Sequence, residues 1–243
     1  MRVFLAGASG VIGRGLAPLL VRAGHQVTGT TRNADKASAL RALGADPVVV
    51  DVFDAAKLSE LVAAARPDAI MHQLTDLPFA PGTPRYEEGL KHNARLRIEG
   101  TRNLVAAARA ACVTRMVAQS IAFVYASGAG ARVETDPLAT GAPGLLGRTV
   151  EAVQAPLENG VLALPEGIVL RYAFLYGPGT WFVDGPGRTP AVHVDAAAQA
   201  ALLALSKGKP GVYNVGEDDP GLSSEKAKRE LGFDASFRPD PPP

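Results

Sequence analysis

The sequence is short of several residue types, and each shortage excludes a class of protein. Cys112 is the only cysteine in 243 residues, which excludes an internal disulfide. Lysine and arginine (25) balance aspartate and glutamate (24) without a basic stripe, so we expect no nucleic-acid partner. No apolar run is long enough to span a membrane, and the first strand begins at the initiator methionine, so we expect a cytoplasmic protein.

Sites of two other kinds are also missing. The four histidines and the lone cysteine show no ligand spacing, so we expect no metal site. The sequence contains no G-x-S-x-G element, which argues against a serine hydrolase. Cys112 ends an alanine-rich helical stretch, and we expect it to be a small buried hydrophobic residue.

The chain does contain a strand, a glycine turn and a helix at its very start. Residues 3–6 are uniformly apolar, as is typical of a strand buried in a parallel sheet. Three glycines follow at three-residue spacing, and apolar residues then recur at helical intervals. This order is the context of a dinucleotide-binding fingerprint, although an ordinary glycine-rich turn is the alternative. The cofactor contacts expected here are Gly7, Ser9, Gly10, Val11, Ile12 and Gly13.

Strand and helix signals alternate along the rest of the chain. We expect strands at 25–31, 47–50, 68–72, 113–119, 167–172 and 211–215, and helices at 35–43, 54–65, 86–111, 149–157, 195–205 and 223–231. Asp54 and Asp195 are the expected N-caps of two of these helices. The order predicts an α/β fold: a doubly wound, parallel, Rossmann-type sheet. We expect a nucleotide-binding domain at 1–176 and a small, shortened substrate region at 177–243, with an extended or disordered Pro-Asp-Pro-Pro-Pro end.

The end of the second strand indicates which nucleotide is bound. An acidic residue there accepts a hydrogen bond from the ribose of NAD, whereas an arginine accommodates the 2′-phosphate of NADP. Thr31 is followed by Arg32 and Asn33, and the first acid is Asp35, which is better placed to start a helix. Arg32 therefore favours NADP over NAD, with a solvated loop arginine as the alternative reading.

Several motifs outside the glycine turn are specific when they are taken together. They are Asn93-x6-Gly100-Thr101-x-Asn103-Leu104, Ser120 with Val124-Tyr125, Leu170-Arg171-Tyr172 with Tyr176-Gly177-Pro178-Gly179, His193-Val194-Asp195, Tyr213-Asn214-Val215-Gly216 and Lys226-x-Lys228-Arg229-Glu230-Leu231-Gly232. With them the chain resembles, nearly end to end, the extended and atypical short-chain dehydrogenase/reductases, the NAD(P)-dependent epimerase/dehydratase group. The resemblance implies further cofactor contacts at Thr31, Asp51, Val52, Gln73, Leu74, Asn93, Gln119 and Tyr172.

The resemblance also implies a serine, a tyrosine and a lysine as the catalytic set, with the spacing Tyr-x-x-x-Lys. No lysine lies between Lys91 and Lys207, and no tyrosine has a lysine four residues later. A register set by Glu151 places Pro143 and Gly147 where the tyrosine and lysine belong. Ile121 takes the place of the serine, with Ser120 one residue early. The usual proton relay is therefore absent from the sequence.

Other groups remain as substitutes. Ser120, Tyr125, Tyr176 and His193 could serve at the substrate, while Arg148 could replace only the missing positive charge, because a guanidinium is never a base. His72 also lies on the ligand side, although a structural role suits it at least as well. The segment between Trp181 and His193 is short for a lid, so we expect water to be poorly excluded.

Two hypotheses about function follow. The first is an NADP-dependent oxidoreductase or epimerase-like enzyme, acting on a small carbonyl or hydroxyl compound with a non-standard proton donor. The second is an NADP-binding regulatory or scaffold protein without ordinary turnover. In either role the chain could be a monomer or a homodimer.

Overall fold

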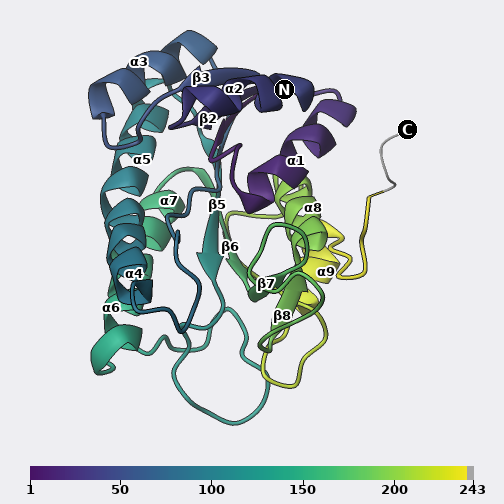
Figure 1. Cartoon of the computed structure of the whole chain (residues 1–243). Helices are drawn as coiled ribbons and strands as arrows, with labels where there is room; N and C mark the ends of the chain where they lie inside the picture. Colours follow the sequence, from purple (N-terminus) through teal and green to yellow (C-terminus); the bar gives the residue numbers. More distant parts are fainter. Residues whose placement is uncertain (240–243) are drawn as a thin grey trace.

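The computed structural model describes residues 1–239 and is organised around a seven-stranded parallel sheet (Figure 1). The strand order is β3-β2-β1-β4-β5-β6-β9. Their bounds are β1 (Arg2–Ala6), β2 (Gln26–Thr31), β3 (Asp46–Val49), β4 (Ala69–His72), β5 (Arg115–Ile121), β6 (Glu166–Tyr172) and β9 (Gly211–Val215). A separate parallel pair joins β7 (Phe174–Tyr176) to β8 (Ala191–His193). The predicted doubly wound α/β fold is confirmed.

Helices cover both faces of the sheet. They are α1 (Val11–Arg22), the 3-10 turn η1 (Ala34–Lys36), α2 (Ala37–Ala42), α3 (Ala55–Ala65), α4 (Tyr86–Arg95), the π-turn η2 (Leu96–Gly100), α5 (Thr101–Ala110), α6 (Gly144–Ala152), the π-turn η3 (Val153–Asn159), α7 (Gly160–Leu162), α8 (Val194–Ala204) and α9 (Glu225–Leu231). None of these helices has the length and apolar character needed to cross a membrane.

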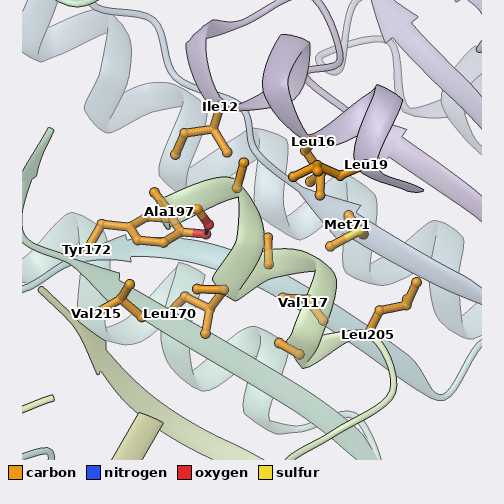
Figure 2. Packing of buried hydrophobic residues seen from close by; sticks show 14 of the residues in the cluster. Ile12, Leu16, Leu19, Met71, Val117, Leu170, Tyr172, Ala197, Leu205 and Val215 are labelled. Carbon is orange, nitrogen blue, oxygen red and sulfur yellow. Dashed lines mark hydrogen bonds between the residues drawn. The ribbon is translucent and has the colours of Figure 1, made fainter. Parts of the chain in front are cut away.

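Two apolar cores hold these layers together. On one face, α1 and α8 pack against each other and against the sheet, with Leu16 and Ala197 fully buried (Figure 2). On the other face, α3 and α5 pack together over Phe4 and Ile70. Because strands in such a sheet are buried on both sides, they read as continuous apolar runs rather than alternating ones.

Several details differ from the sequence-based expectations. The expected long helix at 86–111 is interrupted by the π-turn η2, where the Cβ that Gly100 lacks would lie 3.0 Å from Val52. The helix expected at 149 begins at Gly144, inside a segment rich in glycine and proline, because α6 packs against α4. The α8 cap is His193, whose Nδ1 accepts from the backbone N–H of Asp195, so the prediction that Asp195 is the cap was wrong.

The prediction for Cys112 was also wrong. The residue is exposed, because it occupies the turn after α5 with a φ of 56°, which directs its side chain away from the core. The Pro-Asp-Pro-Pro-Pro prediction falls, beyond Pro239, on residues 240–243, which lie outside the described residues.

Candidate functional site

A cavity of about 240 Å³ lies at the carboxyl ends of the first four strands of the chain, where ligands bind in open α/β sheets. It brings together predicted contacts from the glycine turn, from the end of β2 and from the loop after β4. Those lining it are Gly7, Ser9, Gly10, Thr31, Arg32, Val52, Gln73 and Leu74. The cavity is also lined by residues that were not predicted from the sequence: Ala6, Thr30, Asn33, Lys36, Val50, Phe53, Leu58, Thr75 and Leu96.

The glycine turn is tight enough that side chains cannot be added to it. Gly7 has a φ of 89°, and the Cβ it lacks would lie 2.6 Å from the carbonyl oxygen of Gln73. A Cβ on Gly13 would lie 2.1 Å from the carbonyl oxygen of Gly7. The observed close approach of α1 to β1 therefore requires glycine at position 13. Gly10 caps α1 without a side-chain bond, which leaves the first N–H groups of α1 for an anionic ligand. This cradle fits the pyrophosphate of a dinucleotide.

Gln73 supports the same fit. Gln73 is one of the residues that line the cavity, and its side-chain amide is buried near the Tyr172 hydroxyl. Within residues 1–239 neither the amide oxygen nor the amide nitrogen forms a hydrogen bond. A buried amide without partners is costly, so such a group is expected to meet a polar ligand or water. The backbone of Gln73 meanwhile closes the turn, since its N–H donates to the carbonyl of Ala6.

Two positively charged residues, Arg32 and Lys36, line the cavity just after the end of β2. Arg32 pairs with Asp76 at 3.1 Å, and the N–H of Asp76 donates to Asn93 at 3.0 Å. Asn93, a predicted cofactor contact, therefore holds the loop after β4 and does not line the cavity. Lys36 is a second cation beside Arg32, and its place four residues after Arg32 was the signal that could have found it.

The other predicted cofactor residues surround the cavity rather than line it. The Asp51 carboxylate accepts from the N–H of Phe53, and the Gln119 amide donates to the carbonyl of Leu74. Tyr172 is buried on the α8 side, where its hydroxyl donates to Ala197 and burial raises its pKa. Val11, Ile12 and Gly13 lie in the first turn of α1.

Ser120 and Tyr125, both predicted to be catalytic, lie in a buried polar network. The Ser120 hydroxyl donates to Glu158 at 2.6 Å, and Glu158 is bound by Arg171 through two hydrogen bonds. Arg171 also donates to the Tyr125 hydroxyl, which in turn donates to Asn214 at 2.6 Å. Glu158 holds the pKa of Arg171 above its usual range against the effect of burial, while desolvation raises that of Tyr125. Both hydroxyl protons are therefore engaged with buried acceptors.

Glu151, from which the register was drawn, is not the acid of this network. Glu151 is exposed, whereas Glu158 is only 2 % exposed and is the acid that binds Arg171. The same spacing counted back from Glu158 gives Val150 and Gln154 in place of Pro143 and Gly147. Neither register supplies a tyrosine or a lysine.

The side chains around this position are apolar. Val124, Val150 and Val153 form a small buried cluster on which Ile121 packs, at the end of β5. Arg148, proposed from the sequence as a substitute cation, is exposed on α6. These buried valine side chains offer no proton donor at the position where the resemblance implies one.

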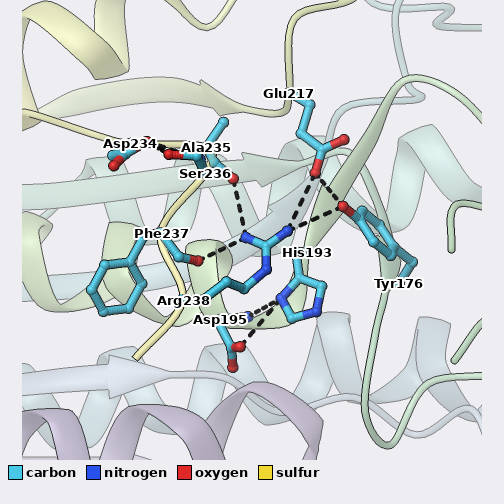
Figure 3. Close-up of polar contacts among 9 residues, drawn as sticks. All are labelled: Tyr176, His193, Asp195, Glu217, Asp234, Ala235, Ser236, Phe237 and Arg238. Atoms are coloured by element: carbon cyan, nitrogen blue, oxygen red, sulfur yellow. Dashed lines mark hydrogen bonds and ion pairs between the residues drawn. The ribbon is translucent and has the colours of Figure 1, made fainter. Parts of the chain in front are cut away.

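A second polar cluster follows β7 and β8 (Figure 3). The Tyr176 hydroxyl donates to Glu217 at 2.5 Å and accepts from Arg238 at 3.2 Å. Burial and the Glu217 carboxylate both raise the pKa of Tyr176. The His193 ring lies edge-on to Tyr176, and burial lowers its pKa, while its Nδ1 is occupied by Asp195. The cluster could hold a proton, but the Tyr176 hydroxyl already donates its own proton to Glu217.

The glycine cradle, the unpartnered Gln73 amide and the sheet order define a dinucleotide-binding α/β protein. Comparison with known proteins agrees with this class, because a family model described as NAD(P)H-binding matches residues 7–144. The chain belongs to this NAD(P)H-binding family.

Relatives and solved structures extend the match beyond that segment. The chain is 40 % identical, over 93 % of its length and 79 % of the relative's, to a 3-diazoavenalumate denitrifying reductase from Streptomyces sp. It is 28 % identical, over 90 % of its length and 69 % of the relative's, to a 4-hydroxy-2-methyl-3-oxo-4-farnesyl-3,4-dihydroquinoline-1-oxide ketoreductase from Stigmatella aurantiaca. Its fold matches a dTDP-glucose 4,6-dehydratase from Bacillus anthracis in complex with NAD, with a TM-score of 0.75, 16 % identity and coverage of 98 % and 92 %. The expected likeness to epimerases and dehydratases is confirmed for the fold.

Proposed function

We propose that this protein is an NADPH-dependent reductase that replaces the diazo group of a small organic substrate with hydrogen and releases dinitrogen. The relative from Streptomyces supports this reaction, because its name combines a diazo compound with a denitrifying reduction and it matches 93 % of the chain. The apolar cluster after β5, whose buried valine side chains hold no proton donor, is the observation in the structure that carries the proposal.

The chain's own residues divide the work of binding the nucleotide. The N–H groups at the start of α1 receive the pyrophosphate, and the Gln73 amide offers its unused donor and acceptor beside it. Arg32 and Lys36 receive the 2′-phosphate, with Asp76 holding Arg32 in place until the nucleotide arrives. When bound, NADPH supplies the hydride.

An arenediazonium substrate would explain why the chain lacks the usual tyrosine and lysine proton relay. An arenediazonium carbon that accepts a hydride forms a C–H bond and loses dinitrogen together with the electron pair of the C–N bond. The positive charge of the substrate is cancelled by the hydride, so no proton is consumed. The buried cluster that holds Val150, with Ile121 packed on it, needs to supply none.

Carbonyl reduction is the second candidate, and one structural feature favours it. A carbonyl needs a proton as well as a hydride, and the Tyr176 hydroxyl would supply it by releasing Glu217, to which it donates in this structure. The ketoreductase from Stigmatella is a relative with that type of name. A regulatory or scaffold role remains the alternative if the nucleotide binds and no substrate turns over.

The nucleotide part is tested by titrating the protein with NADPH and with NADH. We expect NADPH to bind more tightly, and Arg32→Ala to weaken NADPH at least tenfold, about 1.4 kcal/mol, without affecting NADH. Arg109→Gln, a change of an exposed arginine at the far end of α5, is the matched control and should change neither affinity. Equal loss of both nucleotides in Arg32→Ala would contradict the assignment of Arg32 to the 2′-phosphate.

The reaction is tested by following NADPH oxidation with an arenediazonium salt and with a panel of aldehydes and ketones. We expect the diazonium to be reduced, with one dinitrogen released per NADPH, above the rate without enzyme. Tyr176→Phe should leave this reaction intact. Turnover of carbonyls alone, abolished by Tyr176→Phe, would establish the second candidate instead.

A further inference from the structure

Two aromatic side chains stand at the carboxyl ends of neighbouring strands, beyond the nucleotide cavity. Phe123 comes two residues after β5, and Phe174 comes two residues after β6. Their rings stack with centroids 4.3 Å apart and planes 4° apart. Since β4 separates β1 from β5 and β6 in the sheet, this pair lies farther along the same edge than the cradle formed by Gly7 and Gly10. A dinucleotide that runs along this edge brings its reactive ring toward the pair.

The pair is rigid and partly open. Phe123 is 38 % exposed although it is a large hydrophobic residue, while its stacking on Phe174 fixes its orientation. Exposed apolar surface of this kind is typical of a site that a ligand covers. The edge of a stacked aromatic pair favours contact with another aromatic ring.

A positive charge lies beside this surface. The guanidinium carbon of Arg188 is 5.6 Å from the centre of the Phe174 ring, and Arg188 forms no ion pair within residues 1–239. Arg188 belongs to the segment between β7 and β8, which also carries Trp181. Trp181 meets Tyr86 at the start of α4, with ring centroids 6.3 Å apart. The segment therefore reaches from β7 to α4 and holds Arg188 beside Phe174.

We propose that Phe123, Phe174 and Arg188 form the substrate-recognition site and that it selects a planar aromatic acid. We call these three residues the aromatic shelf. The ring of the substrate packs edge-on against the stacked pair, and its carboxylate pairs with Arg188, which forms no ion pair within the described residues. This inference rests on the proposed function, because it assigns the substrate class of the same reductase.

The experiment measures binding of unreactive probes to the protein saturated with NADP⁺, by calorimetry or ligand-observed NMR. The probes are trans-cinnamate, its amide, and 3-cyclohexylpropanoate, which keeps the carboxylate but has no aromatic ring. We expect cinnamate to bind at least tenfold more tightly than either of the others. Equal affinity for cinnamate and 3-cyclohexylpropanoate would overturn the role of the ring, and equal affinity for cinnamate and its amide would overturn the role of the charge.

Variants assign the effect to the aromatic shelf. Arg188→Gln should weaken cinnamate at least tenfold and leave the amide unchanged, while Phe123→Leu should weaken both and Phe123→Tyr should restore them. Arg109→Gln is the control for loss of an exposed arginine and should have no effect. Unchanged NADP⁺ affinity in each variant shows that the fold is intact. Cinnamate binding without turnover of any diazonium would refute the proposed function alone, whereas turnover that ignores Arg188 and Phe123 would refute this inference alone.

Discussion

At the scale of single residues, the ion pair between Glu158 and Arg171 is the most consequential buried feature. Both residues are almost completely buried, and Ser120 and Tyr125 complete their hydrogen bonds. Removing one partner leaves an uncompensated charge in a low-dielectric interior. Glu158→Gln should therefore lower the free energy of unfolding by about 3–5 kcal/mol, measured by urea denaturation.

The chain offers a matched control for that prediction. Glu166 pairs with Arg115 at 3.0 Å, but its side chain is about half exposed. Glu166→Gln should cost about 1 kcal/mol or less, because water screens the pair. Similar losses in the two variants would mean that burial does not determine the importance of the Glu158 pair.

His72 gives a second prediction at this scale, concerning pH. Its Nδ1 accepts from the N–H of Leu74 and its Nε2 lies 2.9 Å from the Thr101 hydroxyl. Burial, and secondarily the charge of Arg97, lowers the pKa of His72 to about 4. Between these two pKa values the unfolded chain binds a proton at His72 and the folded chain does not. The contribution of His72 to the free energy of unfolding is therefore fully present above pH 6.5 and is lost, by about 3 kcal/mol, as the pH drops toward 4.

Denaturation of wild type and His72→Gln between pH 7 and pH 4.5 measures this term. The variant has no imidazole at position 72 and should lose less stability on acidification than the wild type. His92→Gln removes an exposed histidine from α4 and should keep the wild-type acid dependence. The same acid dependence in His72→Gln and wild type would show that His72 does not titrate in this range.

At the scale of elements, the approach of α1 to β1 decides whether the nucleotide site forms. A methyl group at Gly13 would collide with the carbonyl of Gly7, so Gly13→Ala must push the helix away from the strand. We expect it to lower the free energy of unfolding by about 1–3 kcal/mol and to weaken NADPH binding at least tenfold.

Gly15 in the same helix is the control. A Cβ there meets only Ala198, at the ordinary distance of 3.6 Å, so Gly15→Ala should raise stability by about 0.5–1 kcal/mol through better helix propensity. NADPH binding should be unchanged in this variant. If both alanines had the same effect on binding, the close approach of α1 would not be the cause.

The elements also show which features local sequence predicts and which depend on tertiary contacts. The glycine turn and the Asp54 cap were predictable because each depends on a few neighbouring residues. The start of α6 at Gly144 was not, because contact with α4 overrides a local composition that favours a loop. Glu158 rather than Glu151 is the buried acid of this region because Glu158 contacts Arg171, and no local pattern distinguishes the two glutamates.

At the scale of the whole molecule, the order of strands and helices was enough to predict the parallel sheet, since crossovers of one hand leave few arrangements. The residues that line the cavity were predictable in part, because they follow successive strands. The side-chain contacts beyond the cavity were not. Phe123 with Phe174, and Tyr176 with Glu217 and Arg238, are brought together only by the fold.

The central claim is that a substrate carbon receives a hydride here without a protein proton donor. Isotope tracing tests it most directly, with an arenediazonium substrate reduced once by [4,4-²H₂]NADPH in H₂O and once by NADPH in D₂O. We predict one deuterium, at the carbon that carried nitrogen, in the first product and none at that carbon in the second. Deuterium entering that carbon from D₂O would contradict the claim.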